Sequence, residues 1–257
     1  MGDIFRLDGK TAFVSGSRGH LGQAMAGALA GAGAHVILNG RDDARLADQE
    51  AALKAAGHSA SRASFDVTDI AAVRRFFGGL TRLDILVNNF VSMRVKPFAA
   101  VQPEDFITTY ASAVTVAFES VRAALPALKT AVAADGDASV INIASMYAQV
   151  APDARIYDDR DQQSPFHYGP AKAGLLQLTR HLAAELGRDG IRVNALVPGS
   201  FSAKAPPALA ARLAERTMLN RLGRADEIAG PLLFLAAPAS SYVTGASLNV
   251  DGGWTAW

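Results

Sequence analysis

The sequence predicts an α/β fold in which helices cover both faces of a parallel, doubly wound sheet. Two observations support this prediction. Short β-rich runs alternate along the chain with longer helical stretches, and the β-rich runs are almost continuously apolar. Strands of this composition are typical of parallel sheets that are buried on both faces. No linker, composition shift or internal repeat divides the 257 residues, so we expect a single domain over residues 1–257.

Six runs are predicted to form strands, because each is short, apolar and separated from the next by a helical stretch. Right-handed crossovers between such strands produce the doubly wound arrangement. The six runs are TAFVS (11–15), HVILN (35–39), DILVN (84–88), SVINIA (139–144), RVNALV (192–197) and SLNV (247–250).

Seven stretches are predicted to be helical. In the fifth of them Leu175, Leu178 and Leu182 recur near the period of an amphipathic face. The Ala-rich patch at 205–214 also favours a helix over disorder, because apolar residues recur in it. The predicted helices are 20–31, 43–56, 69–78, 103–133, 166–187, 206–217 and 225–236.

Composition argues against several classes of function. Half of the residues are hydrophobic, which is enough for a sizeable core. The formal net charge is +1 and there is no basic run, so we expect no nucleic-acid or membrane-surface partner. The chain has no cysteine and its histidines lack metal-ligand spacing, so we expect no metal. The first residues lack a signal-peptide core and no apolar run reaches membrane-spanning length, so we expect a cytoplasmic protein.

The first predicted strand runs into a glycine-rich turn that opens the first predicted helix. Gly16, Gly19 and Gly22 have the spacing G-x-x-G-x-x-G, which differs from the G-x-G-x-x-G dinucleotide fingerprint. Glycines let a phosphate approach the backbone closely, and a helix N-terminus favours negative charge. The turn therefore predicts an anion site at the carboxyl end of the sheet, where ligands of such folds bind. A tight turn without a ligand is the alternative.

Tyr168 and Lys172 lie four residues apart in a predicted helix, so both side chains project from one side of it. A phenol with a pKa near ~10 exchanges protons poorly at neutral pH. A neighbouring ammonium group favours the phenolate and lowers that pKa, which makes the tyrosine a candidate general acid or base. The alternative is a buried tyrosine and a solvated lysine on an ordinary helix.

Seven segments, taken in order over the whole chain, resemble the short-chain dehydrogenase/reductase family. They are SGSRGHLG (15–22), FDVTD (65–69), DILVNN (84–89), INIAS (141–145), YGPAK (168–172), RVNALVPG (192–199) and YVTGASLNVDGG (242–253). The resemblance implies a Rossmann fold with a seven-stranded sheet, a nicotinamide cofactor, and hydride transfer at a carbon–oxygen bond.

The resemblance assigns catalytic roles to three residues. Tyr168 is the proton donor and acceptor. Lys172 lowers the pKa of Tyr168 and holds the nicotinamide ribose. Ser145 hydrogen-bonds the substrate oxygen, although in isolation the simpler role for this serine is to cap the loop after its strand. His167 precedes Tyr168, and we expect it to serve packing or to lie on the surface rather than to act in catalysis.

The resemblance also implies residues that bind the cofactor. The alternatives are that Asn88 ties strands together and that Asp66 is an ordinary turn residue. The predicted cofactor-binding residues are Gly16, Ser17, Arg18, His20, Leu21 and Gly22 in the first turn, Asn39 and Arg41 after the second strand, Asp66 and Val67 beside the adenine, Asn88 after the DILVN strand, Tyr168 and Lys172, and Pro198 and Gly199 beside the nicotinamide.

The end of the second predicted strand favours NADP(H) over NAD(H). Asn39 stands where NAD-dependent proteins of this fold carry an acidic residue for the ribose hydroxyls. Arg41 and Arg18 could hold a 2′-phosphate between two guanidinium groups. Two ordinary surface arginines are the alternative.

Several positions depart from the family's pattern. His20 takes the place of the middle glycine of the first turn. Phe90, followed by Val91, replaces a small pair after the two asparagines. Ala113 replaces the asparagine that often completes a proton relay, and either Ser112 or water could substitute for it. These departures keep open a second class of function, a nucleotide-binding scaffold or sensor without turnover.

An enlarged loop at 146–167 separates Ser145 from Tyr168 and carries several charged residues. Long loops with fixed ends are often functional, although a solvated surface excursion is the alternative. A similar loop in gluconate 5-dehydrogenase-like members favours a small polar substrate such as a sugar acid or polyol. The other enzymatic interpretation is a 3-oxoacyl thioester reductase, since 3-oxoacyl-[acyl-carrier-protein] reductase-like members share every motif used here.

We also expect a homotetramer. The predicted helices at 103–133 and 166–187 are long and rich in small residues, which permits close packing across a two-fold axis, and the family resemblance implies the same assembly. Trp254 and Trp257 would be poor surface residues on a monomer. The alternative is that both pack on their own subunit.

Overall fold

The computed structural model describes residues 4–202 and 205–257 and contains one seven-stranded sheet. Every pairing is parallel, and the strand order β3-β2-β1-β4-β5-β6-β7 reverses direction between β1 and β4. This confirms the predicted doubly wound fold in a single domain. The strands are β1 (Thr11–Val14), β2 (His35–Gly40), β3 (Ala60–Ser64), β4 (Ile85–Asn88), β5 (Ala138–Ile143), β6 (Ile191–Pro198) and β7 (Ser247–Val250).

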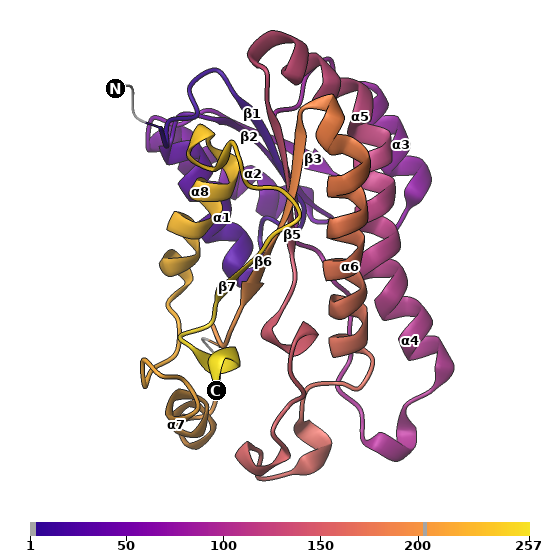
Figure 1. The fold of residues 1–257 in the computed structure, drawn as a ribbon, viewed down its shortest axis with the longest axis vertical. Helices are drawn as coiled ribbons and strands as arrows, with labels where there is room; N and C mark the ends of the chain where they lie inside the picture. Colours follow the sequence, from indigo (N-terminus) through magenta and orange to yellow (C-terminus); the bar gives the residue numbers. More distant parts are fainter. Residues whose placement is uncertain (1–3, 203–204) are drawn as a thin grey trace.

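Helices cover both faces of the sheet, as Figure 1 shows. One apolar core lies under α1, α2 and α8, and a second lies under α3, α5 and α6. The helices are α1 (His20–Gly31), α2 (Asp43–Ala55), α3 (Ile70–Gly78), α4 (Pro103–Tyr110), α5 (Val116–Asp135), α6 (Tyr168–Leu186), α7 (Pro207–Glu215) and α8 (Ala229–Ala236). The last predicted helix begins with a 3₁₀ turn, Ala225–Ile228, before α8.

All six apolar runs predicted as strands form strands. The seventh strand, β3, was not indicated by the pattern of apolar residues. Its sequence is ASRAS, and only Ala60 and Ala63 are buried. β3 forms one edge of the sheet and pairs only with β2. An edge strand needs less apolar surface than a central one, so periodicity and hydrophobicity give it little signal.

The helix predicted over 103–133 is interrupted by a π-helical turn, Ala111–Thr115, between α4 and α5. The stretch Pro103–Asp135 is also long and apolar enough to cross a membrane by length and composition, contrary to the expectation that no run is. However, 61% of its apolar window is buried inside the protein. Contacts with α3 and α6 therefore account for its composition.

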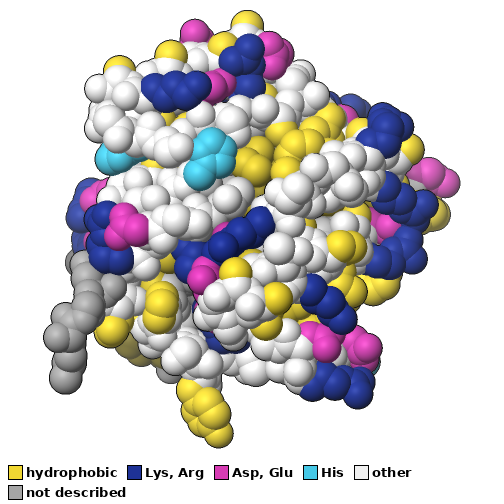
Figure 2. Space-filling view, turned by 90° about the horizontal axis from the view of Figure 1, so that it is seen from above, with side chains coloured by type: hydrophobic (Ala, Val, Ile, Leu, Met, Phe, Trp, Pro, Cys, Tyr) yellow, Lys and Arg dark blue, Asp and Glu magenta, His cyan; other side chains and the backbone are white. Residues whose placement is uncertain are grey.

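At the amino end of the strands, charged side chains form mixed ion pairs. Lys10 Nζ lies 2.7 Å from Asp135 and 3.4 Å from Asp84, and Arg82 pairs with both of these carboxylates. Figure 2 shows the molecule from this end, with basic and acidic side chains interspersed over the surface.

At the carboxyl end of the strands, the enlarged loop packs against α7, and both lie at the bottom of Figure 1. Met146 and Ile156 of the loop form an apolar cluster with Leu213 of α7 and Trp254. Trp254 is therefore buried within its own subunit, which agrees for this residue with the alternative to an interface role. Trp257 is 65% exposed. This packing fixes the loop over the edge of the sheet where the predicted site residues lie.

Candidate active site

The first turn is built closely around its glycines. Gly16 has φ +61°, a left-handed conformation that suits glycine. A Cβ on Gly22 would lie 2.3 Å from the carbonyl oxygen of Gly16, so only glycine lets helix and turn approach this closely. The N-terminus of α1 has no side-chain cap at Gly19 and no acidic residue in its first turn. Its backbone N–H groups and the positive end of its dipole are therefore available to an anion.

Two residues that were not predicted as part of the site hold this turn in place. Asn89 Nδ2 donates to the carbonyl oxygens of Ser15 (3.0 Å) and Gly16 (3.1 Å). In return, Ser15 Oγ accepts from the backbone N–H groups of Asn89 (2.9 Å) and Phe90 (3.2 Å). The second asparagine of the DILVNN segment was the available sequence signal. These bonds tie the end of β4 to the end of β1.

Two predicted cofactor-binding residues use their side chains as scaffold. Ser17 Oγ lies 3.0 Å from Gln49 Oε1, and Gln49 Nε2 donates to the Ser17 carbonyl at 3.0 Å. Asn39 Nδ2 donates to the carbonyl oxygens of Ala63 (3.0 Å) and Phe65 (3.2 Å). Ser17 thus anchors the turn to α2, Asn39 joins the end of β2 to the end of β3, and both side chains are buried.

Asn88 and Val67 are also placed inside the scaffold. Asn88 Nδ2 donates to Asn142 Oδ1 at 2.9 Å, and Asn142 Nδ2 donates to Thr179 Oγ1 at 2.9 Å. This chain joins β4, β5 and α6, which is the strand-tying role considered for Asn88. Val67 is 4% exposed and belongs to the core beneath α3 and α5.

The three predicted catalytic residues lie together. Ser145 follows β5, while Tyr168 and Lys172 occupy the first turns of α6. Ser145 lies close enough to Tyr168 to influence the pKa of its phenol, and Ser145 Oγ accepts from the backbone N–H of Tyr147 at 3.2 Å. All three line one cleft of about 460 Å³, together with Gly16, Gly19, His20, Leu21, Gly22, Asn89, Phe90, Val91, Ile143, Ala144, Pro198 and Gly199.

Burial favours the neutral form of both Tyr168 and Lys172. Desolvation raises the pKa of the Tyr168 phenol, and the hydrogen bond from Ser145 partly offsets this rise. Burial lowers the pKa of Lys172 to about 7. Lys172 Nζ donates to the Ile143 carbonyl oxygen at 2.6 Å and lies 5.9 Å from the centre of the Tyr168 ring. Burial and Ser145 account for the shift of the Tyr168 pKa, and the lowering of that pKa by Lys172 stays a prediction.

The position of the absent relay asparagine is apolar. Ala113 is 2% exposed and packs with Ala171 and Leu175 of α6. The neighbouring Ser112 hydroxyl donates to the Thr109 carbonyl oxygen at 3.0 Å and accepts from the backbone N–H of Ser92 at 3.0 Å. Ser112 is thus engaged with the segment after β4 and does not replace the asparagine beside Lys172.

His167 is buried, as the packing interpretation expects. Its Nδ1 lies 2.8 Å from Thr109 Oγ1, and its ring meets the Phe106 ring edge-on at 5.9 Å. These contacts join the start of α6 to α4 and fix the helix that carries Tyr168.

A second cavity, of about 430 Å³, opens beside the ends of β2 and β3 and is lined by Arg41, Asp66 and Phe90, among others. Arg41 Nη1 lies 3.6 Å from Asp66 Oδ2, and Asp66 Oδ1 accepts from the Thr68 backbone N–H at 2.9 Å. In the described part of the chain, the buried Nε of Arg18 in the first turn has no hydrogen-bond partner, and Arg18 lines neither cavity. The exposed guanidinium group of Arg41 has donors available to a ligand.

The charged residues of the enlarged loop pair mainly with each other and with α7. Arg155 pairs with Asp153 at 2.8 Å. Arg212 of α7 pairs with Asp158 at 2.8 Å and donates from Nε to the Ile156 carbonyl oxygen at 2.6 Å. These bonds fasten the loop to α7 at the rim of the cleft, which leaves fewer of its charges for a substrate.

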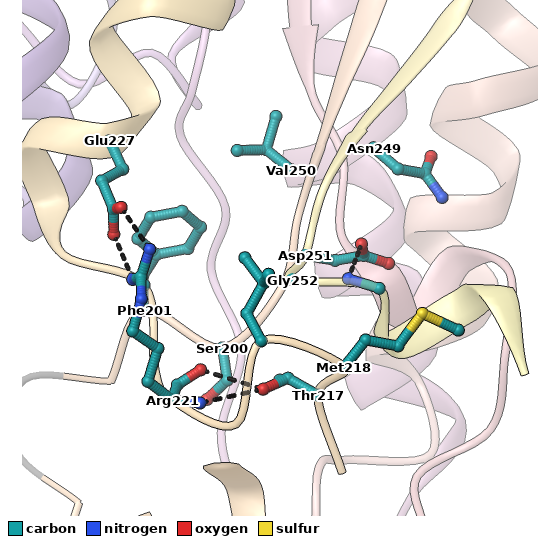
Figure 3. Close-up of a pocket in the computed structure, with 13 residues that line it drawn as sticks. Ser200, Phe201, Thr217, Met218, Arg221, Glu227, Asn249, Val250, Asp251 and Gly252 are labelled. Atoms are coloured by element: carbon teal, nitrogen blue, oxygen red, sulfur yellow. Dashed lines mark hydrogen bonds and ion pairs between the residues drawn. The ribbon is translucent and has the colours of Figure 1, made fainter. Parts of the chain in front are cut away.

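A third cavity, of about 370 Å³, lies beside the end of β7 (Figure 3). Several of its polar side chains already have partners. Arg221 makes two 2.7 Å bonds to Glu227, and Thr217 Oγ1 bonds to the backbone of Arg221. Asp251 accepts from the backbone N–H groups of Gly253 and Thr255. Asp251, which lines this cavity, also packs closely against the turn at Gly199, where a Cβ would lie 2.5 Å from Asp251 Cα.

The residues of the main cleft fit a nicotinamide dinucleotide. The glycine turn and the uncapped N-terminus of α1 suit a pyrophosphate. The buried Lys172 is available to ribose hydroxyls, and Ser145 and Tyr168 lie beyond it in the same cleft. Within residues 4–202 and 205–257, no three His, Asp or Glu side chains are grouped so that they could hold a metal ion.

Comparison with known proteins identifies the class. A family model described as "Enoyl-(Acyl carrier protein) reductase" matches residues 17–255. The chain belongs to the short-chain dehydrogenase/reductase family, and its named relatives are dehydrogenases and reductases. It is similar to gluconate 5-dehydrogenase of Gluconobacter oxydans (strain 621H), with 33% identity over 270 residues covering 98% of this chain and 97% of that protein.

Two further relatives extend the comparison. The rhamnolipids biosynthesis 3-oxoacyl-[acyl-carrier-protein] reductase of Pseudomonas aeruginosa is 34% identical over 265 residues, covering 99% of each chain. The crystal structure of a gluconate 5-dehydrogenase from Burkholderia cenocepacia J2315 in complex with NADP and tartrate matches with a TM-score of 0.86 and 32% identity, covering 99% of this chain and 98% of that one. The family and the cleft together support an NAD(P)-dependent oxidoreductase.

Proposed function

We propose that the protein is an NADP(H)-dependent oxidoreductase that interconverts a ketone and a secondary alcohol, with Tyr168 as the acid and base. The observation that carries this proposal is the convergence of Ser145, Tyr168 and Lys172 on the cleft that also contains the glycine turn. When bound, the nicotinamide ring supplies or accepts the hydride. The protein's own residues position the substrate oxygen and exchange its proton.

The three side chains divide this work. Ser145, which lies close to Tyr168 in the same cleft, fixes the substrate oxygen beside the Tyr168 hydroxyl. In reduction, the Tyr168 hydroxyl donates its proton to the oxygen of the former carbonyl, and in oxidation the phenolate accepts the proton of the alcohol. Lys172 binds ribose hydroxyls and, when charged, stabilises the phenolate. Since Ala113 cannot hydrogen-bond through its side chain, water would complete any relay from Lys172.

A preference for NADP(H) rests on Arg41 and Arg18. Their guanidinium groups have donors to offer to a 2′-phosphate, and charge-assisted bonds to phosphate are among the strong hydrogen bonds of proteins. Fluorescence titration with NADPH and NADH tests the preference. We expect NADPH to bind about tenfold or more tightly, and Arg41→Ala to remove most of that difference. Tighter binding of NADH by the natural sequence would overturn it.

For the substrate, we propose a compact polar hydroxy or keto compound, such as a sugar acid or polyol. Support comes from the similarity to gluconate 5-dehydrogenase and from the polar loop fastened at the rim of the cleft. The second candidate is a 3-oxoacyl thioester, which the similarity to the acyl-carrier-protein reductase favours. Comparison of kcat/KM for gluconate-type substrates and an acetoacetyl thioester separates them, and a strong preference for the thioester would establish the second.

A nucleotide-binding scaffold or sensor is the alternative from another class, motivated by His20 in the first turn and by Ala113. A spectrophotometric screen of NADPH oxidation with a panel of ketones decides between the classes. Binding of NADPH without any turnover of the panel would favour the scaffold. We also propose that the protein is cytoplasmic and works as a homotetramer.

A further inference from the structure

Phe90 occupies the point where the two neighbouring cavities meet. It lines both the 460 Å³ cleft that contains the catalytic residues and the 430 Å³ cavity beside Arg41. It is half-buried and packs against the core beneath α3 and α5. Its backbone N–H donates to Ser15 Oγ, so it is tied to the glycine turn. A small residue at this position would leave the two cavities without this shared wall.

The cavity beside Arg41 has the features of a site for a purine nucleoside. It is within the usual size range of small-molecule sites, about 300–1,000 Å³. Arg41 and Asp66 stand on its rim, and Phe90 and Val116 contribute apolar wall. Aromatic rings and guanidinium planes both stack on nucleobases, since every base has a π-face.

We propose that Phe90 forms an aromatic wall for the adenine of the cofactor and thereby divides the site into an adenine compartment and a nicotinamide compartment. The proposal rests on the proposed NADP(H) dependence. The adenine would lie between the Phe90 ring and the Arg41 guanidinium, with the pyrophosphate passing over the glycine turn into the catalytic cleft. Phe90 is then a residue that sets affinity for the adenine half of the cofactor only.

The test separates the two halves of the cofactor. Binding of adenosine 2′,5′-bisphosphate, which carries the adenine half, and of reduced nicotinamide mononucleotide, which carries the other, is measured by calorimetry. For Phe90→Ala we expect about tenfold weaker binding of the bisphosphate and an unchanged affinity for the mononucleotide. Phe90→Tyr keeps the aromatic face and should bind both fragments within about twofold of the natural sequence. Thermal melting of each variant shows whether it is folded.

Each outcome has a definite meaning. Unchanged or tighter binding of the bisphosphate by folded Phe90→Ala overturns the proposal, since the ring would then be neutral or an obstruction. Equal weakening of both fragments also overturns it, because the change would then act through the glycine turn. If Phe90→Ala does not fold, Phe90→Leu keeps the bulk of the side chain and removes the aromatic face; weaker binding of the bisphosphate alone by folded Phe90→Leu supports the proposal, and unchanged binding overturns it. If the natural sequence binds neither the bisphosphate nor NADPH, the proposed function itself fails.

Discussion

Tyr168 and Lys172 illustrate how burial sets reactivity in this protein at the scale of single residues. Burial raises the pKa of the phenol and lowers that of the ammonium group to about 7, so near neutral pH the tyrosine is protonated and the lysine is divided between its two forms. In the proposed reduction, a protonated Tyr168 would donate its proton to the carbonyl oxygen. Oxidation of an alcohol requires the phenolate, and therefore a charged Lys172 or higher pH.

Tyr168→Phe should abolish most turnover while cofactor binding stays within about twofold of the natural sequence. The substitution removes one hydroxyl and keeps the ring, and general acid–base catalysis contributes about 10²–10⁴-fold to such reactions. Steady-state kinetics and fluorescence titration with NADPH measure the two effects. A variant that keeps a substantial fraction of the rate would show that Tyr168 does not transfer the proton.

Lys172→Met should raise the melting temperature at pH 6, and the gain should shrink toward pH 9. The unfolded chain has the ordinary lysine pKa of 10.5, while the folded protein holds Lys172 at about 7. Between these values the unfolded state binds more protons, so the contribution of this lysine to the free energy of unfolding rises with pH from about 7 to about 10.5. Below that window the folded protein contains a buried charge that methionine removes.

Lys129→Met serves as the control for the lysine prediction, because Lys129 is half-exposed in an ion pair with Asp189. Its melting temperature should follow that of the natural sequence at both pH values. A gain for Lys172→Met that is the same at pH 6 and pH 9 would show that burial does not lower the pKa of Lys172.

At the scale of elements, close contact with the backbone of the preceding turn limits which side chains fit at the start of α1. A Cβ on Gly22 would touch the backbone of the preceding turn, whereas a Cβ on Gly27, five residues further along the same helix, would meet no atom within 4 Å. The same substitution at these two glycines therefore tests close approach separately from helix propensity.

Gly22→Ala should destabilise the protein by about 1–3 kcal/mol, the usual range for overpacking, and should weaken NADPH binding, because the Gly16 carbonyl must move. Gly27→Ala should stabilise it by up to about 1 kcal/mol, since alanine favours a helix interior. Urea unfolding and NADPH titration of both variants measure this. Equal effects of the two substitutions would show that the turn tolerates a side chain at Gly22.

At the scale of the whole molecule, the outer side of α4 and α5 is unusually apolar. Ile107 is 67% exposed, Tyr110 51% and Phe118 39%. Ile107 and Tyr110 also line a cavity of about 400 Å³ with Phe106 and His167. Exposed apolar surface of this kind typically marks a protein–protein contact, and it supports the proposed homotetramer more directly than Trp254, which is buried in its own subunit.

Ile107→Glu should therefore lower the oligomeric state. We expect the natural sequence to behave as a tetramer by light scattering at micromolar concentration, and the variant to form smaller species, because a charge would be buried in the contact. Ala51→Glu, at an exposed position of α2, should leave the tetramer intact. A monomer for the natural sequence, or a tetramer for Ile107→Glu, would exclude this face as the contact.

The layered α/β fold, six of the seven strands and the neighbouring positions of Tyr168 and Lys172 were predictable from the sequence, and the family resemblance added Ser145 as the third proposed catalytic residue. The fold, the strands and this pair were predictable because buried parallel strands are nearly all apolar and because Tyr168 and Lys172 are neighbours on one helix face. β3 could not be predicted from its pattern, since an edge strand such as ASRAS buries little apolar surface.

The contacts that each polar side chain of the site makes follow from the folded arrangement and not from the sequence pattern. Ser17, Asn39 and Asn88 stand in the segments that the sequence indicated, yet they make hydrogen bonds to Gln49, to the end of β3 and to Asn142. Asn89, which no pattern distinguished from Asn88, holds the glycine turn. The physical reason is that a hydrogen bond depends on the direction of a side chain and on partners far away in sequence. Hydrophobic periodicity reports which face of an element is buried, and it carries no information about those partners.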